Sequence, residues 1–96
     1  MNLKDVICRL RGHWEELEQL GVQSLAVFGS VARGDDGDDS DVDLLVEFSR
    51  PIGFFGFFDV KERLEQILGR QVDLVTRDAV KPALRERIFR EAVDAA

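Results

Sequence analysis

The chain has one cysteine, Cys8, one histidine, His13, and no tyrosine. A single cysteine excludes an internal disulfide and a cysteine-rich metal centre, and a single histidine argues against a histidine-based zinc site. Any bound metal is therefore expected to have oxygen ligands. Because tyrosine is absent, the protein cannot be modified on a tyrosine of its own. Cys8 and His13 have no partner ligand nearby in sequence, and we assign them no chemistry.

Long apolar runs are also absent from the sequence. No stretch approaches the roughly 18 to 20 continuous apolar residues of a membrane-spanning helix, and the first residues contain no apolar block of the kind found in signal peptides. We therefore expect a soluble, cytoplasmic protein that does not contact membranes. Its 96 residues, 45% of them hydrophobic, suffice for one compact domain over 1–96 with a single modest core.

A basic stripe is missing too, which argues against long nucleic acid as a direct partner. The net charge is -6, and it is equalled by six clustered aspartates: Asp35, Asp36, Asp38, Asp39, Asp41 and Asp43. Carboxylates this close repel one another unless they are solvated or neutralised by cations. For the first four, a solvated acidic turn is the simpler interpretation.

Helical and strand patterns alternate along the chain. Apolar residues at steps of three and four predict helices over 3–20, 54–68 and 82–92. Alternation of period two predicts strands over 25–28, 41–48 and 71–76. Only a short helical turn fits between the first two strands, so we expect them to be antiparallel. The sequence thus predicts an α/β fold in which a small mixed three-stranded sheet packs with helices.

Glycine and proline mark the ends of the predicted helices. Gly21 and Gly69 are expected to terminate the first two, and Pro82 suits the first turn of the last. In that last helix, Leu84 and Ile88 are expected to face the core.

The helix over 54–68 contains more phenylalanine than one helix face can bury. Phe57 is expected in the core together with Leu64. Some of Phe54, Phe55 and Phe58 are candidates for an exposed wall that stacks on a base or binds a protein. Ordinary packing in a small domain is the alternative.

The most informative stretch runs from Leu25 to Val46. An apolar strand ends at Gly29-Ser30, and the chain returns through Asp41-Val42-Asp43. The two aspartates share one face of a strand whose other face is apolar, so they project together, about 6 to 7 Å apart at the backbone. Their carboxylates can converge on one hard cation.

Two further features can contribute to a site here. The glycine turn allows close approach of the backbone, and the Ser30 hydroxyl and the Arg33 guanidinium suit an anion; an ordinary strand-to-helix turn is the alternative. It is not a Walker P-loop, because no Gly-Lys-Ser/Thr follows. Asp73 is flanked by apolar residues in the third strand, and a position beside Asp41 and Asp43 would explain it. An edge-strand aspartate that faces water is the alternative.

Gly29-Ser30, ten intervening residues and Asp41-Val42-Asp43 together resemble the signature of the DNA polymerase beta nucleotidyltransferase superfamily. The short chain, the Ala32-Arg33-Gly34-Asp35 continuation and the Val72 to Thr76 strand resemble its minimal nucleotidyltransferase (MNT) branch. The resemblance covers nearly the whole chain and implies the nucleotidyltransferase fold. MNT proteins often serve as antitoxins to HEPN-domain ribonuclease toxins. One departure is the C-terminus, where family members often have an aromatic residue and this chain ends in alanine.

The resemblance also implies roles for the motif residues. The nucleotide site would comprise Gly29, Ser30, Arg33 and Ser40, with the first two at the triphosphate. The catalytic carboxylates would be Asp41, Asp43 and Asp73, and they would bind Mg²⁺ as two ions. ATP would be the substrate.

These features favour a magnesium-dependent protein adenylyltransferase that transfers AMP from ATP to a hydroxyl. By the resemblance, the acceptor would be a tyrosine of a partner HEPN toxin, and AMP transfer would silence it. One alternative is an antitoxin that masks its toxin through the phenylalanine-rich helix, with weak or absent catalysis. Another is transfer to a small molecule such as an aminoglycoside, although those enzymes generally need a second domain. A homo-oligomer or a hetero-oligomer with the toxin is compatible with each hypothesis.

Overall fold

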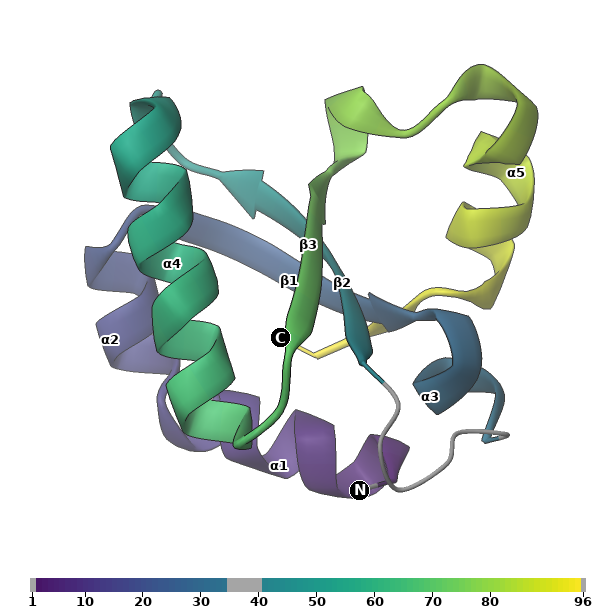
Figure 1. Ribbon diagram of the computed structural model, residues 1–96, viewed down its shortest axis with the longest axis horizontal. Helices are drawn as coiled ribbons and strands as arrows, with labels where there is room; N and C mark the ends of the chain where they lie inside the picture. The colour runs from purple at the N-terminus through teal and green to yellow at the C-terminus, as the bar shows by residue number, and fades with distance from the viewer. Residues whose placement is uncertain (1, 35–40, 96) are drawn as a thin grey trace.

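The computed structural model describes residues 2–34 and 41–95, which form a mixed sheet with helices on both faces (Figure 1). The elements are, in order, α1 (Leu3–Gly12), α2 (Trp14–Gln19), β1 (Val22–Phe28), α3 (Gly29–Arg33), β2 (Val42–Phe48), α4 (Gly53–Leu68), β3 (Val72–Thr76), the 3₁₀ helix η1 (Arg77–Ala79), α5 (Pro82–Glu91) and β4 (Val93–Asp94). The strand order is β3-β2-β1-β4. β1 is antiparallel to β2 and β4, whereas β2 and β3 are parallel.

The predicted α/β fold with a mixed sheet is confirmed, but the sheet has a fourth strand that the sequence did not predict. β4 pairs with β1 through Ala26 opposite Asp94, and the Ala95 amide donates to the Leu25 carbonyl at 2.9 Å. A strand of two residues is too short to show a period of two, so only its pairing reveals it. This pairing attaches the end of α5 to β1.

The prediction of one helix over 3–20 is wrong, because the segment forms two helices. The Asn2 side chain caps α1 by accepting a hydrogen bond from the Asp5 amide at 2.9 Å. The helix ends at Gly12, a residue type of low helix propensity, and His13 has a non-helical backbone with φ of -116° and ψ of 17°. The apolar stripe survives the break, since Leu10 and Leu17 are both fully buried.

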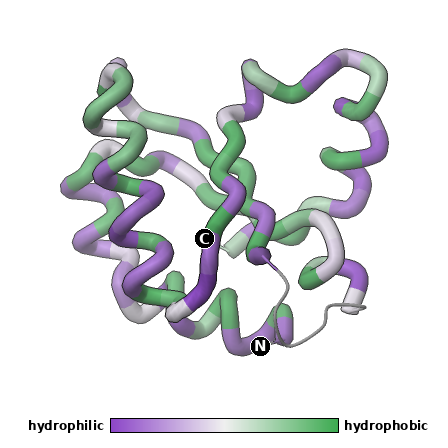
Figure 2. The backbone as a smooth tube through the Cα atoms, viewed as in Figure 1, coloured by the Kyte–Doolittle hydropathy of each residue, from purple (hydrophilic) through white to green (hydrophobic). Residues whose placement is uncertain are grey.

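The main core lies between the sheet and α1, α2 and α4. Its fully buried side chains include Val6, Leu10, Leu17, Val27, Val42, Leu44, Val46 and Leu64. The strands run through the centre of the molecule as largely hydrophobic segments (Figure 2). Each such leucine or valine contributes about 1.5 to 3 kcal/mol when it is removed from water. Within the described ranges, no helix is both long and apolar enough to cross a bilayer.

The opposite face of the sheet is covered only in part. A small cluster of Ala26, Leu45 and Val80 lies there, and Ile88 of α5 packs against it. Leu84, which we expected in the core, is 46% exposed. The reason is that α5 contacts β1 and α3 at one side of this face and does not lie across it. The beginnings of β2 and β3 are therefore left accessible.

Candidate functional site

The three predicted carboxylates lie at the beginnings of two neighbouring strands. Because β2 and β3 are parallel, Asp43 and Asp73 are directly opposite in the register, and Asp41 immediately precedes β2. The Val42 amide donates to the Gln71 carbonyl at 3.0 Å and joins the two strand beginnings. Asp43 is half-buried, whereas Asp41 and Asp73 are exposed. β3 is an edge strand, so Asp73 both faces water and lies beside Asp43.

Gly29 brings the glycine turn against this group. Phe28, the last residue of β1, is opposite Asp43 in the antiparallel register, and Gly29 follows it with φ of 73°. A Cβ atom on Gly29 would overlap the Asp43 carboxylate and lie 3.2 Å from the Asp43 Cβ. Glycine is therefore required here both for the left-handed backbone and for space. Ser30, the next residue, is half-buried.

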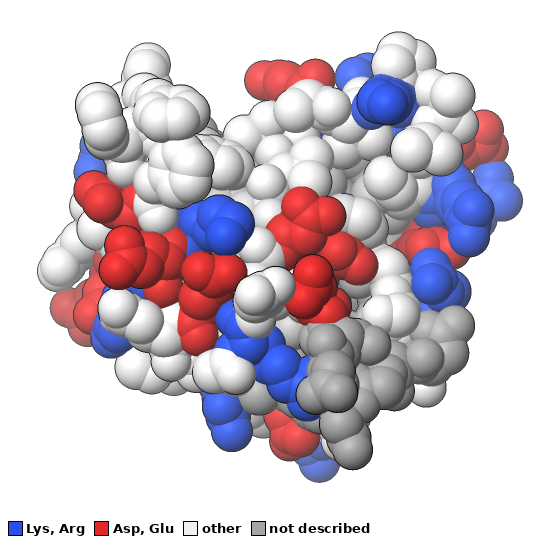
Figure 3. All heavy atoms as spheres, in the orientation of Figure 1, with Lys and Arg blue, Asp and Glu red and all other residues white. Residues whose placement is uncertain are grey.

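The electrostatics of the site centre on Asp43. Burial raises the pKa of its carboxyl, nearby Asp73 and Asp41 raise it further, and Arg33 lowers it. Acidic side chains gather in the middle of the face that Figure 3 shows. Such convergence of like charges disfavours the ionised form of each carboxylate, and a bound cation would relieve it.

This pKa shift predicts a gain in stability for Asp43→Asn in protein free of divalent cations. Since the folded-state pKa is raised, the folded state binds the proton more readily, and the carboxylate costs stability as pH rises through that pKa. At neutral pH in a chelator, Asp43→Asn should therefore melt at a higher temperature than the parent. The gain should vanish as pH falls below 3.8, the ordinary pKa of an aspartate carboxyl. Calorimetry across pH checks this, with the exposed Asp59→Asn on α4 as control; equal gains for both variants would contradict it.

The carboxylate oxygens of this site are suitable ligands for magnesium. Carboxylate oxygens are the hard ligands that Mg²⁺ prefers, and magnesium usually takes one or two of them together with substrate phosphates and water. Among the residues that the structure describes, no group of three or more acidic, histidine or cysteine side chains is already assembled to hold a metal. Carboxylates such as Asp41 and Asp43 therefore fit an ion that also binds the phosphates of a nucleotide.

Arg33 is joined to a residue that the sequence did not single out. Its Nη1 donates to Oε2 of Glu91, the last residue of α5, at 3.1 Å. Glu91 also pairs with Nε of Arg87, one helical turn earlier, at 3.4 Å. Arg33 and Glu91 are 58 positions apart, so no local pattern could have found the contact. Ser40, together with Asp35, Asp36, Asp38 and Asp39, lies outside the described residues.

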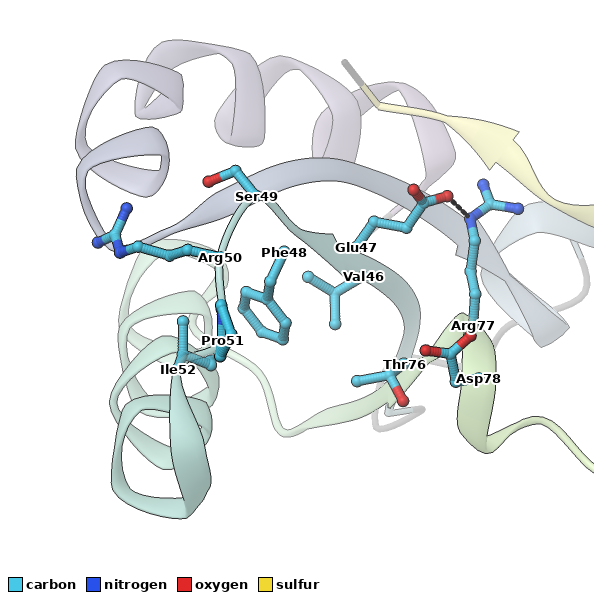
Figure 4. Close-up of a pocket in the computed structure, with 10 residues that line it drawn as sticks. All are labelled: Val46, Glu47, Phe48, Ser49, Arg50, Pro51, Ile52, Thr76, Arg77 and Asp78. Carbon is cyan, nitrogen blue, oxygen red and sulfur yellow. Dashed lines mark ion pairs between the residues drawn. The ribbon is translucent and has the colours of Figure 1, made fainter.

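A cavity of about 630 Å³ lies at the other end of the same two strands (Figure 4). It is lined by Val46, Glu47, Phe48, Ser49, Arg50, Pro51, Ile52, Thr76, Arg77 and Asp78. Arg77 pairs with Glu47 at 2.5 Å on one side of it. None of the described site residues lines this cavity, so it is separate from the group of carboxylates.

Comparison with known proteins identifies the family to which this chain belongs. The model of a family described as "Nucleotidyltransferase domain" matches residues 7–95. The chain belongs to the nucleotidyltransferase domain family. This confirms the family that the Gly-Ser and Asp-Val-Asp motifs predicted. The two motifs meet because β1 and β2 are antiparallel neighbours with Phe28 opposite Asp43.

Named relatives and solved structures support the same family assignment. Protein adenylyltransferase MntA of Thermococcus cleftensis is 38% identical over 94 residues, which is 97% of this chain and 95% of the relative. A solved structure described as a minimal nucleotidyltransferase is 38% identical with a TM-score of 0.82, covering 97% of this chain and 95% of that one. A toxin-antitoxin complex with AMP-PNP has a TM-score of 0.70 at 21% identity, covering 100% of this chain and 73% of that one. This last match shows a shared fold.

Proposed function

We propose that this nucleotidyltransferase transfers AMP from ATP to a hydroxyl of a partner HEPN-domain toxin and thereby acts as an antitoxin. The observation that carries the proposal is the meeting of Asp41, Asp43 and Asp73 beside the Gly29 turn. The name of the Thermococcus cleftensis relative supports protein adenylylation. A chain of a solved complex, described as a tri-AMPylated Shewanella oneidensis HEPN toxin with an MNT antitoxin, shares this fold, with a TM-score of 0.66 at 16% identity over 93% of this chain and 70% of that one.

In the proposed reaction, the acceptor oxygen attacks the α-phosphorus of ATP. A new phosphorus-oxygen bond forms, the bond to the bridging oxygen breaks, and pyrophosphate leaves. Asp41 and Asp43 would hold magnesium together with the nucleotide, and the ion would neutralise charge on the triphosphate and on the leaving pyrophosphate. Asp73, exposed beside Asp43, takes the acceptor proton or completes the metal site. Gly29 and Ser30 hold the phosphates in line.

The accessibility of the site favours a protein as the acceptor. Asp41 and Asp73 are exposed where β2 and the edge strand β3 begin, and the side chain of a second macromolecule can reach them there. The acceptor we propose is a tyrosine of the toxin, since this chain has none. A small-molecule acceptor is less well supported, because the cavity in Figure 4 is lined by none of the described carboxylates of the site.

The direct test is the intact mass of the protein encoded beside this chain, which the proposal takes to be the HEPN toxin. The two proteins are incubated with magnesium and ATP, and mass spectrometry then follows the toxin. A gain of one or more AMP units supports transfer and identifies its substrate. No gain, with a stable complex still formed, contradicts the transferase and leaves the masking antitoxin.

An exposed aromatic cluster supports this second candidate, an antitoxin that acts by binding. Phe54, Phe55 and Phe58 at the beginning of α4 are 70%, 82% and 48% exposed. The Phe54 ring contacts those of Phe55 and Phe58 edge-on, with centroids 5.8 and 4.8 Å away. Phe57, as predicted, turns toward the core and lies 6.4 Å from Phe48. Three adjoining exposed aromatic rings are typical of a protein-binding surface.

Replacing Phe54, Phe55 and Phe58 with serine is expected to weaken binding to the toxin by about a hundredfold or more if this cluster is the masking surface. The side chains are exposed, so the melting temperature should change little. Isothermal titration measures the dissociation constant. Leu84→Ser, which removes an exposed apolar side chain from α5, is the matched control. Unchanged affinity of the triple variant would remove the cluster from the interface.

A further inference from the structure

The Arg33 guanidinium connects the candidate site to an acidic residue from a distant part of the chain. Arg33 is the last residue of the short helix α3, which begins at Gly29, the residue that lies against the Asp43 carboxylate. The Arg33 Nη1 donates to Glu91 at 3.1 Å. The Glu91 side chain is 24% exposed, against 40% for Arg33, which makes the glutamate the more buried member of the pair. Glu91 therefore restrains an arginine that lies next to the site.

The backbone around Glu91 fixes its position. The Ala92 amide donates to the Ile88 carbonyl at 2.9 Å, and β4 begins at the next residue and pairs with β1. β1 leads directly into α3, whose last residue is Arg33. Both members of the pair are thus attached to the same strand, the arginine through the chain and the glutamate through β4. This common attachment brings the two residues close together although they are distant in sequence.

We propose that Glu91 is a positioning residue for the nucleotide: it holds the Arg33 guanidinium beside the Gly29-Ser30 turn, where the arginine contacts the triphosphate. This inference rests on the proposed function. An arginine side chain has many rotamers, and fixing it before the nucleotide arrives reduces the entropy lost on binding. A guanidinium has five N–H donors, so a bond to Glu91 is compatible with bonds to phosphate oxygens.

A second glutamate on the same helix provides a matched control. Glu86 pairs with Arg90 at 2.6 Å, one helical turn later, as Glu91 pairs with Arg87 one turn earlier. The Glu86 side chain is 84% exposed, and its ion pair lies within α5. Glu86→Gln therefore removes the same charge and the same kind of helical pair without touching α3.

The experiment is an equilibrium titration of the full chain with AMP-PNP and magnesium, without any acceptor protein. Glu91→Gln keeps the size of the side chain, and a melting curve checks its fold. We expect its dissociation constant to rise by about three- to tenfold, with Glu86→Gln like the parent. In an Arg33→Ala background, Glu91→Gln should change nothing further, because its effect acts through the arginine. In a steady-state assay of AMP transfer, the KM of Glu91→Gln for ATP should rise while its kcat stays the same.

Three outcomes would overturn the inference, and they are distinguishable. Equal affinity of Glu91→Gln and Glu86→Gln would remove Glu91 from nucleotide binding while the proposed function stands. Tighter binding by Glu91→Gln would show that Glu91 competes with phosphate for Arg33, the opposite of positioning. No binding of magnesium and AMP-PNP by the parent chain would overturn the proposed function itself, and the inference with it.

Discussion

Replacing Asp41 and Asp43 together with asparagine is expected to abolish AMP transfer to the toxin, by at least about 10³-fold. Both side chains keep their shape, but the site loses the two negative charges that would hold magnesium at the triphosphate. Because the pKa of Asp43 is raised by burial and by its acidic neighbours, the variant should fold at least as stably as the parent in a chelator. Loss of activity would therefore not reflect loss of fold. Intact mass of the toxin after incubation with magnesium and ATP measures the effect.

Asp59→Asn is the control for this experiment. Asp59 is an exposed residue of α4, the helix that covers the opposite face of the sheet, and its removal should leave AMP transfer unchanged. A toxin that still gains AMP with the double variant would contradict the assignment of these carboxylates. A toxin that gains none but is still bound would show that complex formation does not need the charges.

Gly29→Ala is expected to remove nucleotide binding and transfer at a modest cost in stability. The backbone at Gly29 has φ of 73°, where an alanine costs about 1 kcal/mol. In addition, the new methyl group would overlap the Asp43 carboxylate, so Asp43 must leave its position. A displacement of about 1 Å in a catalytic group can reduce the rate about a hundredfold. Titration with AMP-PNP and the intact-mass assay measure the two effects.

Gly69→Ala separates the backbone effect from the steric one. Gly69 caps α4 with φ of 67°, close to the value at Gly29, and a Cβ there would meet nothing within 4 Å. Both variants should lose similar stability from the left-handed backbone, and only Gly29→Ala should lose activity. Equal activity of the two variants would show that the contact between Gly29 and Asp43 has no functional role.

The helices and strands were predicted correctly where a periodic pattern was long, and wrongly where it was short or interrupted. The alternation over 41–48 predicted β2 and its buried face, on which Val42, Leu44 and Val46 lie. Gly69 ends α4 as expected. The apolar stripe over 3–20 concealed the break at His13, because two helices can continue one stripe. Leu84 was placed wrongly, since helical spacing does not tell how much of a helix a sheet covers.

By itself, the sequence determined the family and the chemistry of the donors. The Gly-Ser turn, the Asp-Val-Asp strand and the absence of other metal ligands are local features, readable from residue type and spacing. The tertiary structure decided what these features meet. The parallel pairing of β2 and β3 puts Asp73 opposite Asp43, and β4 brings Glu91 to Arg33 across 58 positions. Contacts between distant segments depend on strand order and register, which arise from packing of the whole chain, and no local pattern encodes them.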